Sequence, residues 1–392
     1  MNVIRTFHPV GQGAFYTERF YREDQPQAVH NIVYDCGVAW GYIGKVKHVV
    51  TQAFNKDDTI DYLFISHLDY DHISLIKTLL SSVQKVKNIV LPLVSIEQLE
   101  IIVTYYRLSG HDHIVRFLSS IINHLSGDGE DYFGGDYTVY FVGDSNEGNI
   151  NIGNARILEN GKEQETDWEP EWVLIPYNVQ YNFHKQQFIT QLNAQLAKPK
   201  FNAEIQKIGE TPFIKGNDLY DRLKDSALIE KVLENNYLKN AIKEAYKRTP
   251  GGINKNSLLL YSGPARPEFD YVVLSCFAGC RHNCYRCVYS SAGCLYTGDS
   301  TFDKLDFENK FKKVWGCIGT IQLPHHGSVD SFDVTKASID RPYIFPVSCG
   351  YNNSYGHPSG KVLAYLLNQN CYIRIVTEMA NSVYMQRIER VP

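Results

Sequence analysis

The sequence lacks the features that mark membrane-spanning and exported proteins. None of its apolar runs approaches the roughly 18 residues that a membrane-spanning helix needs. Residues 1–8 lack the apolar segment of a secretory signal peptide. These absences predict a cytoplasmic protein with no membrane partner. The sequence also has no internal repeat and no low-complexity tract, which excludes a repeat architecture.

The sequence has little excess charge. Its 39 Lys and Arg residues against 43 Asp and Glu residues give a formal net charge of -4. This balance disfavours a generic nucleic-acid-binding protein, although residues 239–248 and 304–313 could form local basic patches. With 44% hydrophobic and 13% aromatic residues, the 392-residue chain can bury a large core, and its length allows two or three domains.

The nine cysteines are odd in number, and five of them lie within residues 276–294. Such crowding suits a reducing compartment better than a disulfide framework. Three interpretations of the segment fit. A structural zinc could be held by four of six side chains, Cys276, Cys280, His282, Cys284, Cys287 and Cys294. The spacing of the cysteines at 280, 284 and 287 also occurs in iron–sulfur sites, and free or redox-sensitive thiols are the third alternative.

Apolar periodicity predicts a layered α/β protein. Strands are expected at 62–65 and 88–93, and helices at 73–80 and 95–107, which gives a βαβ rhythm. Strands resume after residue 250, and a helix at 358–368 and a last strand at 372–377 are expected to end the chain. Between these parts, residues 183–249 are rich in helix-forming residues and predict a helical insert or lid.

Residues 66–72 read Ser-His-Leu-Asp-Tyr-Asp-His and follow an apolar strand. His67, Asp69, Asp71 and His72 thus place four potential ligands within six residues. Packing such groups at a strand end costs several kcal/mol unless a cation or another partner satisfies them. A solvated turn would account for one such pair of residues, but the density of this cluster favours a divalent metal.

Further candidate ligands follow later strands. They are Asp299, the pair His325 and His326, and His357, each next to a glycine or close to one. Open α/β layers place their sites where strand ends converge, so a site shared with residues 66–72 is expected. Asp35 also follows an apolar strand, where it could cap a turn or fix the orientation of an imidazole.

The chain resembles the metallo-β-lactamase fold superfamily, and within it the soluble metallohydrolase domain of ComEC-type DNA-uptake proteins and their free-standing relatives. Seven motifs in order carry the resemblance: Val10-Gly11-Gln12-Gly13, Val33-Tyr34-Asp35-Cys36-Gly37, Ser66 to His72, Asn254 to Leu258, Thr297-Gly298-Asp299, Pro324-His325-His326-Gly327-Ser328 and Asn353 to Pro358. It implies an αββα sandwich over residues 1–392, built from about 1–182 and 250–392. The helical insert is then 183–249, and residues 276–294 form a cysteine-rich insertion.

The resemblance also implies the roles of individual residues. Two divalent ions would be bound by the predicted metal ligands, which are His67, Asp69, Asp71, His72, Asp299, His326 and His357. Asp299 would bridge the ions. Of His325 and His326, one would bind metal or donate a proton and the other would orient it. The catalytic candidates are Asp71, His325 and His326, and Ser328 would contact a substrate phosphate.

Two positions depart from the usual pattern of the superfamily. Asp69 stands where a second histidine is common, and Asn256 and Ser257 lie near the place of another ligand histidine. A site richer in oxygen shifts the expectation from zinc toward manganese or magnesium, although the general order of metal affinities still favours zinc. The identity of the metal stays open between these ions.

Two ions acting on a shared water make phosphodiester hydrolysis the leading reaction. The resemblance implies a nuclease acting on DNA or RNA. The first alternative is hydrolysis of a small molecule such as a cyclic nucleotide, a lactone or a thioester, which the acidic net charge favours. The second is a non-catalytic component of a defence or signalling complex with protein partners.

Overall fold

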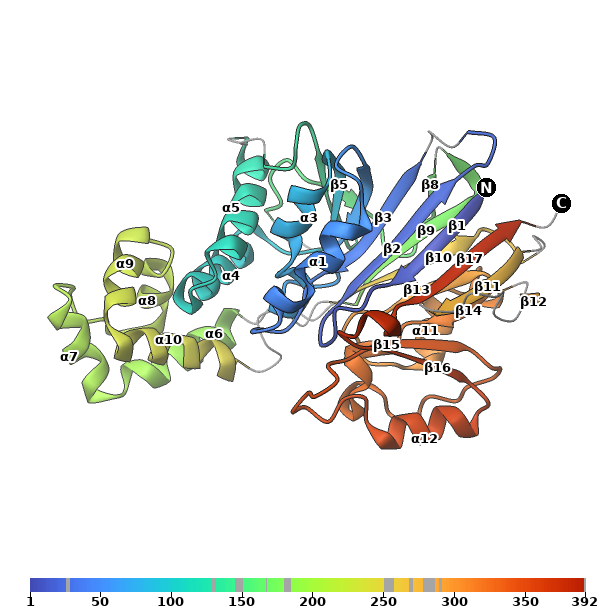
Figure 1. Ribbon diagram of the computed structural model, residues 1–392. Helices are drawn as coiled ribbons and strands as arrows, with labels where there is room; N and C mark the ends of the chain where they lie inside the picture. The colour runs from blue at the N-terminus through green and yellow to red at the C-terminus, as the bar shows by residue number, and fades with distance from the viewer. Residues whose placement is uncertain are drawn as a thin grey trace.

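Two β-sheets lie face to face, with helices on both outer faces (Figure 1). The structure is a computed structural model that describes residues 1–25, 29–127, 132–144, 151–166, 168–179, 185–249, 257–267, 271–277, 286–288 and 291–390. The termini lie near each other at one end of the sandwich, because the first and last strands are antiparallel neighbours with Asn2 opposite Glu389 (Figure 1).

The first sheet mixes parallel and antiparallel strands. Its order is β12 (Arg286–Val288), β11 (Tyr271–Phe277), β17 (Tyr384–Arg390), β1 (Asn2–Phe7), β2 (Phe15–Tyr21), β3 (His30–Cys36), β4 (Thr59–Phe64), β5 (Lys85–Pro92), β6 (Thr138–Val142) and β7 (Arg156–Leu158). The strands from β3 to β7 are parallel neighbours, and the remaining pairs are antiparallel. The carboxyl ends of β3 and β4 therefore lie at the same edge.

The second sheet has the order β16 (Tyr372–Val376), β15 (Ile344–Ser348), β14 (Ile318–Ile321), β13 (Gly293–Tyr296), β10 (Ser257–Pro264), β9 (Glu169–Val179) and β8 (Gln164–Thr166). The strands from β13 to β16 are parallel, and β8, β9 and β10 pair antiparallel, as β10 does with β13. The carboxyl ends of β13, β14 and β15 thus share one edge of this sheet.

Three apolar cores separate the layers. On the outer face of the first sheet lie α1 (Ile43–Ala53), α3 (Ile76–Ser82), α4 (Ile96–Ser109) and α5 (Asp112–Ser126). On the outer face of the second sheet lie α11 (Lys304–Lys310) and α12 (Gly360–Asn368). The third core lies between the sheets and is rich in aromatic rings such as Tyr16, Tyr296 and Trp172. This layer order confirms the predicted αββα class.

A buried ion pair joins the two sheets inside the aromatic core. Arg5 of β1 donates from Nε to Glu18 Oε1 of β2 at 2.6 Å, and both side chains are 1% exposed. The Arg5 guanidinium also donates to the carbonyl of Ser262 in β10 at 3.2 Å and to Gln386 Oε1 in β17 at 2.9 Å. Burial alone would lower the pKa of Arg5, but the Glu18 carboxylate raises it above its ordinary value.

A separate group of helices stands beside the sandwich (Figure 1, left). It consists of α6 (Lys185–Leu196), α7 (Pro199–Lys207), α8 (Gly216–Arg222), α9 (Ser226–Glu234) and α10 (Asn236–Arg248). These helices share their own core and meet α4 through Ile101 and Leu108. The chain leaves β9 at Val179 and re-enters β10 at Ser257, and these two residues are paired in the sheet. Helices thus fill most of the predicted insert.

The prediction of one helix at 73–80 is wrong. A short helix α2 (Tyr70–Ile73) precedes α3, and the break has a local cause. The Ser74 hydroxyl accepts from Val38 N at 2.9 Å and donates to Val38 O at 2.8 Å. Leu75 N donates to Cys36 O at 2.9 Å, outside any helix. Tertiary hydrogen bonds therefore replace the helical ones at this point.

The prediction that 372–377 forms the last strand is also wrong. That segment is the edge strand β16, and β17 follows it and pairs with both β1 and β11. The buried residues Tyr384, Gln386 and Ile388 of β17 alternate with more exposed ones, which is the pattern of a strand with one face in a core. Within the described residues, no helix combines the length and the apolar character that a membrane span requires.

Candidate metal centre

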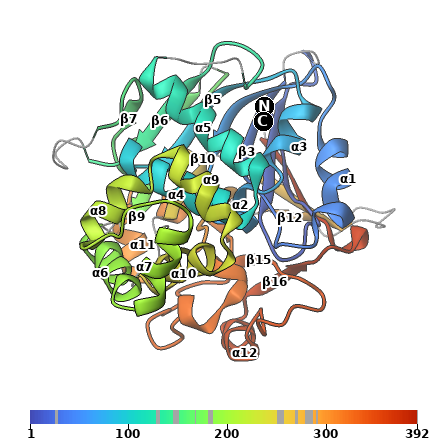
Figure 2. The same ribbon diagram turned by 90° about the vertical axis from the view of Figure 1, so that its left-hand side faces the viewer.

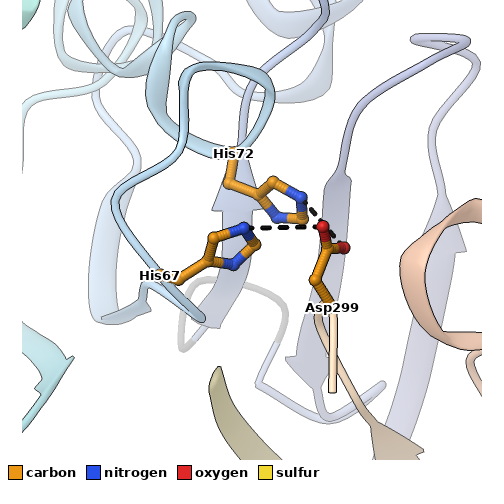
Figure 3. Close-up of side chains that lie close together, drawn as sticks. All are labelled: His67, His72 and Asp299. Carbon is orange, nitrogen blue, oxygen red and sulfur yellow. Dashed lines mark ion pairs between the residues drawn. The ribbon is translucent and has the colours of Figure 1, made fainter. Parts of the chain in front are cut away.

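The predicted site residues lie where strands from both sheets end. His67 follows β4 in the first sheet, whereas Asp299 follows β13, His326 follows β14 and His357 follows β15 in the second. In Figure 3 the rings of His67 and His72 point toward the Asp299 carboxylate from the opposite sheet. The sandwich therefore brings together residues that are more than 200 positions apart in the chain.

Asp35 organises the loop that carries the first two imidazoles. It adopts a left-handed backbone conformation with φ of 58° at the end of β3. Its carboxylate accepts hydrogen bonds from Ser66 N and Ser66 Oγ, both at 2.7 Å, and lies 2.9 Å from His72 Nδ1. His67 Nδ1 lies 2.9 Å from Ser66 Oγ. With both Nδ1 atoms held by these partners, the Nε2 atoms of His67 and His72 are directed at Asp299.

Two glycines allow the backbone of the 66–72 loop to pack closely. Ala14 N donates to Asp71 O at 3.2 Å. A Cβ atom on Gly13 would lie 2.9 Å from Asp71 O, and one on Gly37 would lie 2.5 Å from both the carbonyl carbon and the oxygen of Asp71. The neighbouring atoms are backbone and cannot rotate away, so both motifs need glycine at these positions.

Gly37→Ala is expected to destabilise the protein by about 1–3 kcal/mol because the new methyl group overpacks the Asp71 backbone. Metal affinity should fall as the loop shifts. The matched control is Gly44→Ala in α1, where a Cβ would meet no atom within 4 Å and the change should be neutral or stabilising. Urea denaturation and metal titration of both variants would measure these effects. Equal stability of the two variants would contradict the packing argument.

Asp299 is fixed by hydrogen bonds to the backbone of its own segment. Gln322 Oε1 accepts from Thr297 N at 2.9 Å and from Gly298 N at 3.1 Å, and Ser257 Oγ accepts from Asp299 N at 3.1 Å. The carboxylate then lies 3.6 Å from His67 Nε2 and 3.3 Å from His72 Nε2. The Asp299 carboxylate thus faces both imidazoles.

The structure separates His325 from His326, which the sequence could not do. Both adopt left-handed backbone conformations, with φ of 47° and 55°, and as a result their side chains diverge. His326 is buried, with Nδ1 2.9 Å from Ser348 O and Nε2 3.1 Å from Asp71 Oδ2. The His325 side chain is 41% exposed, and its Nε2 lies 3.5 Å from Asp299 Oδ2. His326 therefore has the surroundings of a metal ligand, and His325 is open to a substrate.

Asp69 and His357 lie at the margin of the site. Asp69 is 55% exposed, with Oδ2 3.6 Å from His67 Nε2. His357 Nδ1 lies 3.5 Å from Gln12 Nε2. The other atom of the Gln12 amide, Oε1, accepts a hydrogen bond from Gly350 N at 3.3 Å. Because that contact makes Gln12 Nε2 the donor, the ring proton of His357 is favoured on its Nε2. Neither Asp69 nor His357 belongs to a group of close ligand atoms among the described residues, so their roles as metal ligands stay predictions.

Opposite charges concentrate in the centre of the site. Burial alone would raise the pKa of Asp71, but His72 and the hydrogen bond from His326 lower it to about 2. Burial would lower the pKa of His72, yet Asp299, Asp35 and Asp71 raise it well above its usual value. The pKa of Asp299 is held well below its usual value by His72 and His67 despite burial. The carboxylates are therefore ionised and ready to bind a cation.

The residues present fit a divalent metal. Three buried atoms, His67 Nε2, His72 Nε2 and Asp299 Oδ1, make no hydrogen bond. Unsatisfied buried polar atoms are rare in native structures and indicate an absent ion or water. The part of the chain that the structure describes contains two groups of possible ligands. Within each group, the ligand atoms all lie within 4.8 Å of one another. The groups are His67, His72 and Asp299, and Asp71, His72 and His326.

Other predicted residues are placed as follows. Asn256 lies outside the described residues. Ser257 Oγ accepts from Asp299 N and so supports the Asp299 segment. Ser328 is 4% exposed, and its Oγ accepts from Asp330 N at 3.3 Å, so it caps a turn rather than facing a substrate.

The proposed zinc site in the cysteine segment cannot be built from the described residues. Cys280, His282 and Cys284 lie outside them, and of Cys276 in β11 and Cys287 in β12 only the backbone is described. Cys294 lies in the core between the sheets, where burial raises the pKa of its thiol to about 12. A protonated thiol in an apolar core is a poor metal ligand.

Sequence reasoning missed several contributors to the site. Ser66 directly precedes His67, and Gln12 lies between two glycines. Their places within the quoted motifs were the available signals. The Ser331 hydroxyl forms a hydrogen bond with His325 Nδ1 at 2.9 Å. Ser348 acts through its backbone carbonyl, which any residue would supply, so its side chain gives no signal in the sequence.

Comparison with known proteins bears on the same region. Residues 30–96 match the sequence model of the metallo-beta-lactamase superfamily, and this span includes Asp35 and the whole 66–72 loop. No curated protein matches the chain. Together with the αββα layers and the two ligand groups, the match supports a metal-dependent hydrolase built on the metallo-β-lactamase sandwich fold.

Proposed function

We propose that the protein is a metal-dependent phosphodiesterase that cleaves nucleic acid. One observation carries the proposal: buried imidazole and carboxylate atoms without hydrogen-bond partners converge beside the exposed His325. This pairing places candidate metal ligands next to a titratable group that a substrate can reach. The superfamily match over residues 30–96 supports hydrolysis as the reaction class.

His67, His72, Asp71, Asp299 and His326 would hold the metal. Their mixture of nitrogen and oxygen donors suits zinc or manganese. A bound divalent ion would supply Lewis acidity toward a phosphoryl oxygen and a water that ionises near neutral pH. Both ligand groups include His72, and its Nε2 atom can bind only one ion. The binding of two ions therefore stays a prediction.

The protein's own side chains would then orient the ligand imidazoles and donate a proton to the leaving group. Asp35 and Ser66 hold the Nδ1 side of the two imidazoles, so their rings keep a fixed orientation. His325 can donate a proton to the leaving oxygen, because it is partly exposed and its Nδ1 is held by Ser331 Oγ. His357, stacked 6.3 Å from His326, would donate a hydrogen bond to a phosphate oxygen.

A substrate panel tests the proposal. The full chain is stripped of metal, reloaded with zinc or manganese, and assayed on single-stranded DNA, duplex DNA, RNA, cyclic dinucleotides, a lactone and a thioester. We expect metal-dependent cleavage of a nucleic acid. Turnover restricted to the lactone or thioester would overturn the proposal, as would full nucleic-acid cleavage by Asp71→Asn. Less than one metal ion per chain after reloading would instead favour a non-catalytic role.

A further inference from the structure

A row of lysines runs along one edge of α10. The apolar residues of this helix, among them Leu238, Ile242 and Tyr246, face the helical core. A lysine comes directly after each of these three residues in the sequence. We define the lysine stripe as Lys239, Lys243 and Lys247. Residues four apart lie on the same side of a helix, so the three ammonium groups project along one line.

Among the described residues, the lysine stripe has no ion-pair partner, whereas several other basic residues of the helical group have one. Lys207 lies 2.7 Å from Glu204, Lys231 lies 2.5 Å from Glu210, and Arg248 lies 2.6 Å from Glu244. No described carboxylate lies within 4.0 Å of any ammonium group of the stripe. Burial and the charges of Lys247 and Lys239 lower the pKa of Lys243. Such mutual repulsion favours an anionic partner.

Three aromatic rings gather at the loop that carries the candidate metal ligands. Tyr70 stands between Asp69 and Asp71 in the metal loop, and its ring centroid is 4.5 Å from that of His111 and 6.2 Å from that of His113. We call these three rings the aromatic platform, and each of them is half-buried. Partly exposed rings can stack with a planar ligand.

The charges of two lysines act on the histidines of the aromatic platform. After burial, the charges of His113 and Lys243 are the main causes that lower the pKa of His111. The pKa of His113 is lowered by burial and then by Lys77 of α3. Tyr105 of α4 lies 5.3 Å from Tyr246 of α10, which holds α10 beside this region. Figure 2 looks onto the side of the molecule that carries α6 to α10.

The strand that follows the helical group in the chain contacts the metal loop. Leu258 N, in the second residue of β10, donates to Ser66 O at 2.7 Å. Strand β10, which comes after α10 in the sequence, is therefore hydrogen-bonded to the loop that carries His67.

We propose that the lysine stripe and the aromatic platform form a track for single-stranded nucleic acid that leads to the metal centre. This inference rests on the proposed function and specifies its substrate class. Lysines placed along a helix match a row of phosphates, and rings can stack with unpaired bases of any sequence. A duplex keeps its bases stacked inside, so it would use the lysines and leave the aromatic platform without a ligand.

The first test is binding of a fluorescein-labelled 15-nucleotide oligo(dT) to the full chain in EDTA, where cleavage is blocked. Replacing all three lysines of the stripe by alanine should reduce the slope of log Kd against log salt concentration by about 2, at roughly 0.7 per phosphate contact. The matched control replaces Lys207, Lys231 and Lys313, which changes the net charge equally and should leave the slope as it was.

The second test concerns stacking. Tyr70→Leu should weaken oligo(dT) binding by roughly 5- to 100-fold, and Tyr70→Phe should retain it, because only the ring is needed. Metal content and thermal stability, measured on both variants, report whether the metal loop is still formed. Equal losses in Tyr70→Leu and Tyr70→Phe would contradict the stacking role.

The outcomes separate this inference from the proposed function. If nucleic acid is cleaved but the stripe variant keeps the wild-type salt slope, the track is refuted and the function stands. Tighter binding of duplex than of single strand would also refute the track. If binding depends on the stripe and no nucleic acid is cleaved by metal-loaded protein, the track stands and the proposed function fails.

Discussion

Asp299→Asn is expected to remove most bound metal and to lower phosphodiester hydrolysis by at least about 10³-fold, since a metal contributes several kcal/mol to such reactions. The substitution keeps the size of the side chain and removes its charge. The Asp299 carboxylate faces His67 and His72, at 3.6 Å and 3.3 Å from their Nε2 atoms. Its loss would leave two buried imidazoles without the carboxylate that they face. Elemental analysis and a cleavage assay measure both effects.

A matched control for this change lies in the same segment of the chain. Asp303 caps α11 by accepting from Asp306 N, and asparagine caps helices about as well as aspartate. Asp303→Asn should therefore keep metal content, activity and stability near those of the unmodified protein. Wild-type metal content in Asp299→Asn would show that the carboxylate is not a ligand.

Arg5→Met is expected to destabilise the protein by about 3–5 kcal/mol, the usual effect of breaking a buried ion pair from one side. Glu18 would keep its hydrogen bond from Tyr296 OH, at 2.9 Å, but would lose the guanidinium at 2.6 Å. Because Arg5 also donates to Ser262 O in the second sheet, the contact between the two sheets would weaken. Urea denaturation followed by far-UV circular dichroism gives the change in unfolding free energy.

Two further variants test whether charge is the cause. In the double variant Arg5→Met with Glu18→Leu, no charge is left in the core, so much of the lost stability should return. Arg387 pairs with Glu389 at the surface, and Arg387→Met should cost only about 0–1 kcal/mol. A double variant as unstable as Arg5→Met alone would place the cause in packing instead.

The layered fold could be predicted from the sequence because its strands and helices carry strong periodic patterns. Ser95 illustrates this: it begins α4 with a full capping box to Gln98, close to the predicted helix start. The break before α3 could not be predicted, because Ser74 is paired with Val38, which is distant in the chain. Strand β17 was missed because its pairing with β1 joins opposite ends of the sequence.

The site shows the same division. The density of His and Asp in residues 66–72 identified the loop, because four such side chains rarely crowd at the end of a buried strand without a cation. The different surroundings of His325 and His326 depend on two consecutive left-handed residues, and single-sequence patterns do not report such backbone conformations. The aromatic platform was not foreseen either, because Tyr70 and His111 meet only when α5 packs against the metal loop.

The pairing of Val179 with Ser257 means that the helical group connects two strands already in hairpin register. The order of strands in the sandwich therefore does not depend on the length of the segment between β9 and β10. Loop-closure entropy grows only slowly with loop length, so a short turn or a larger domain could occupy the same place at small thermodynamic cost. The sandwich can accordingly keep one set of ligands while the surface beside it is exchanged, which makes substrate choice separable from the chemistry of the metal centre.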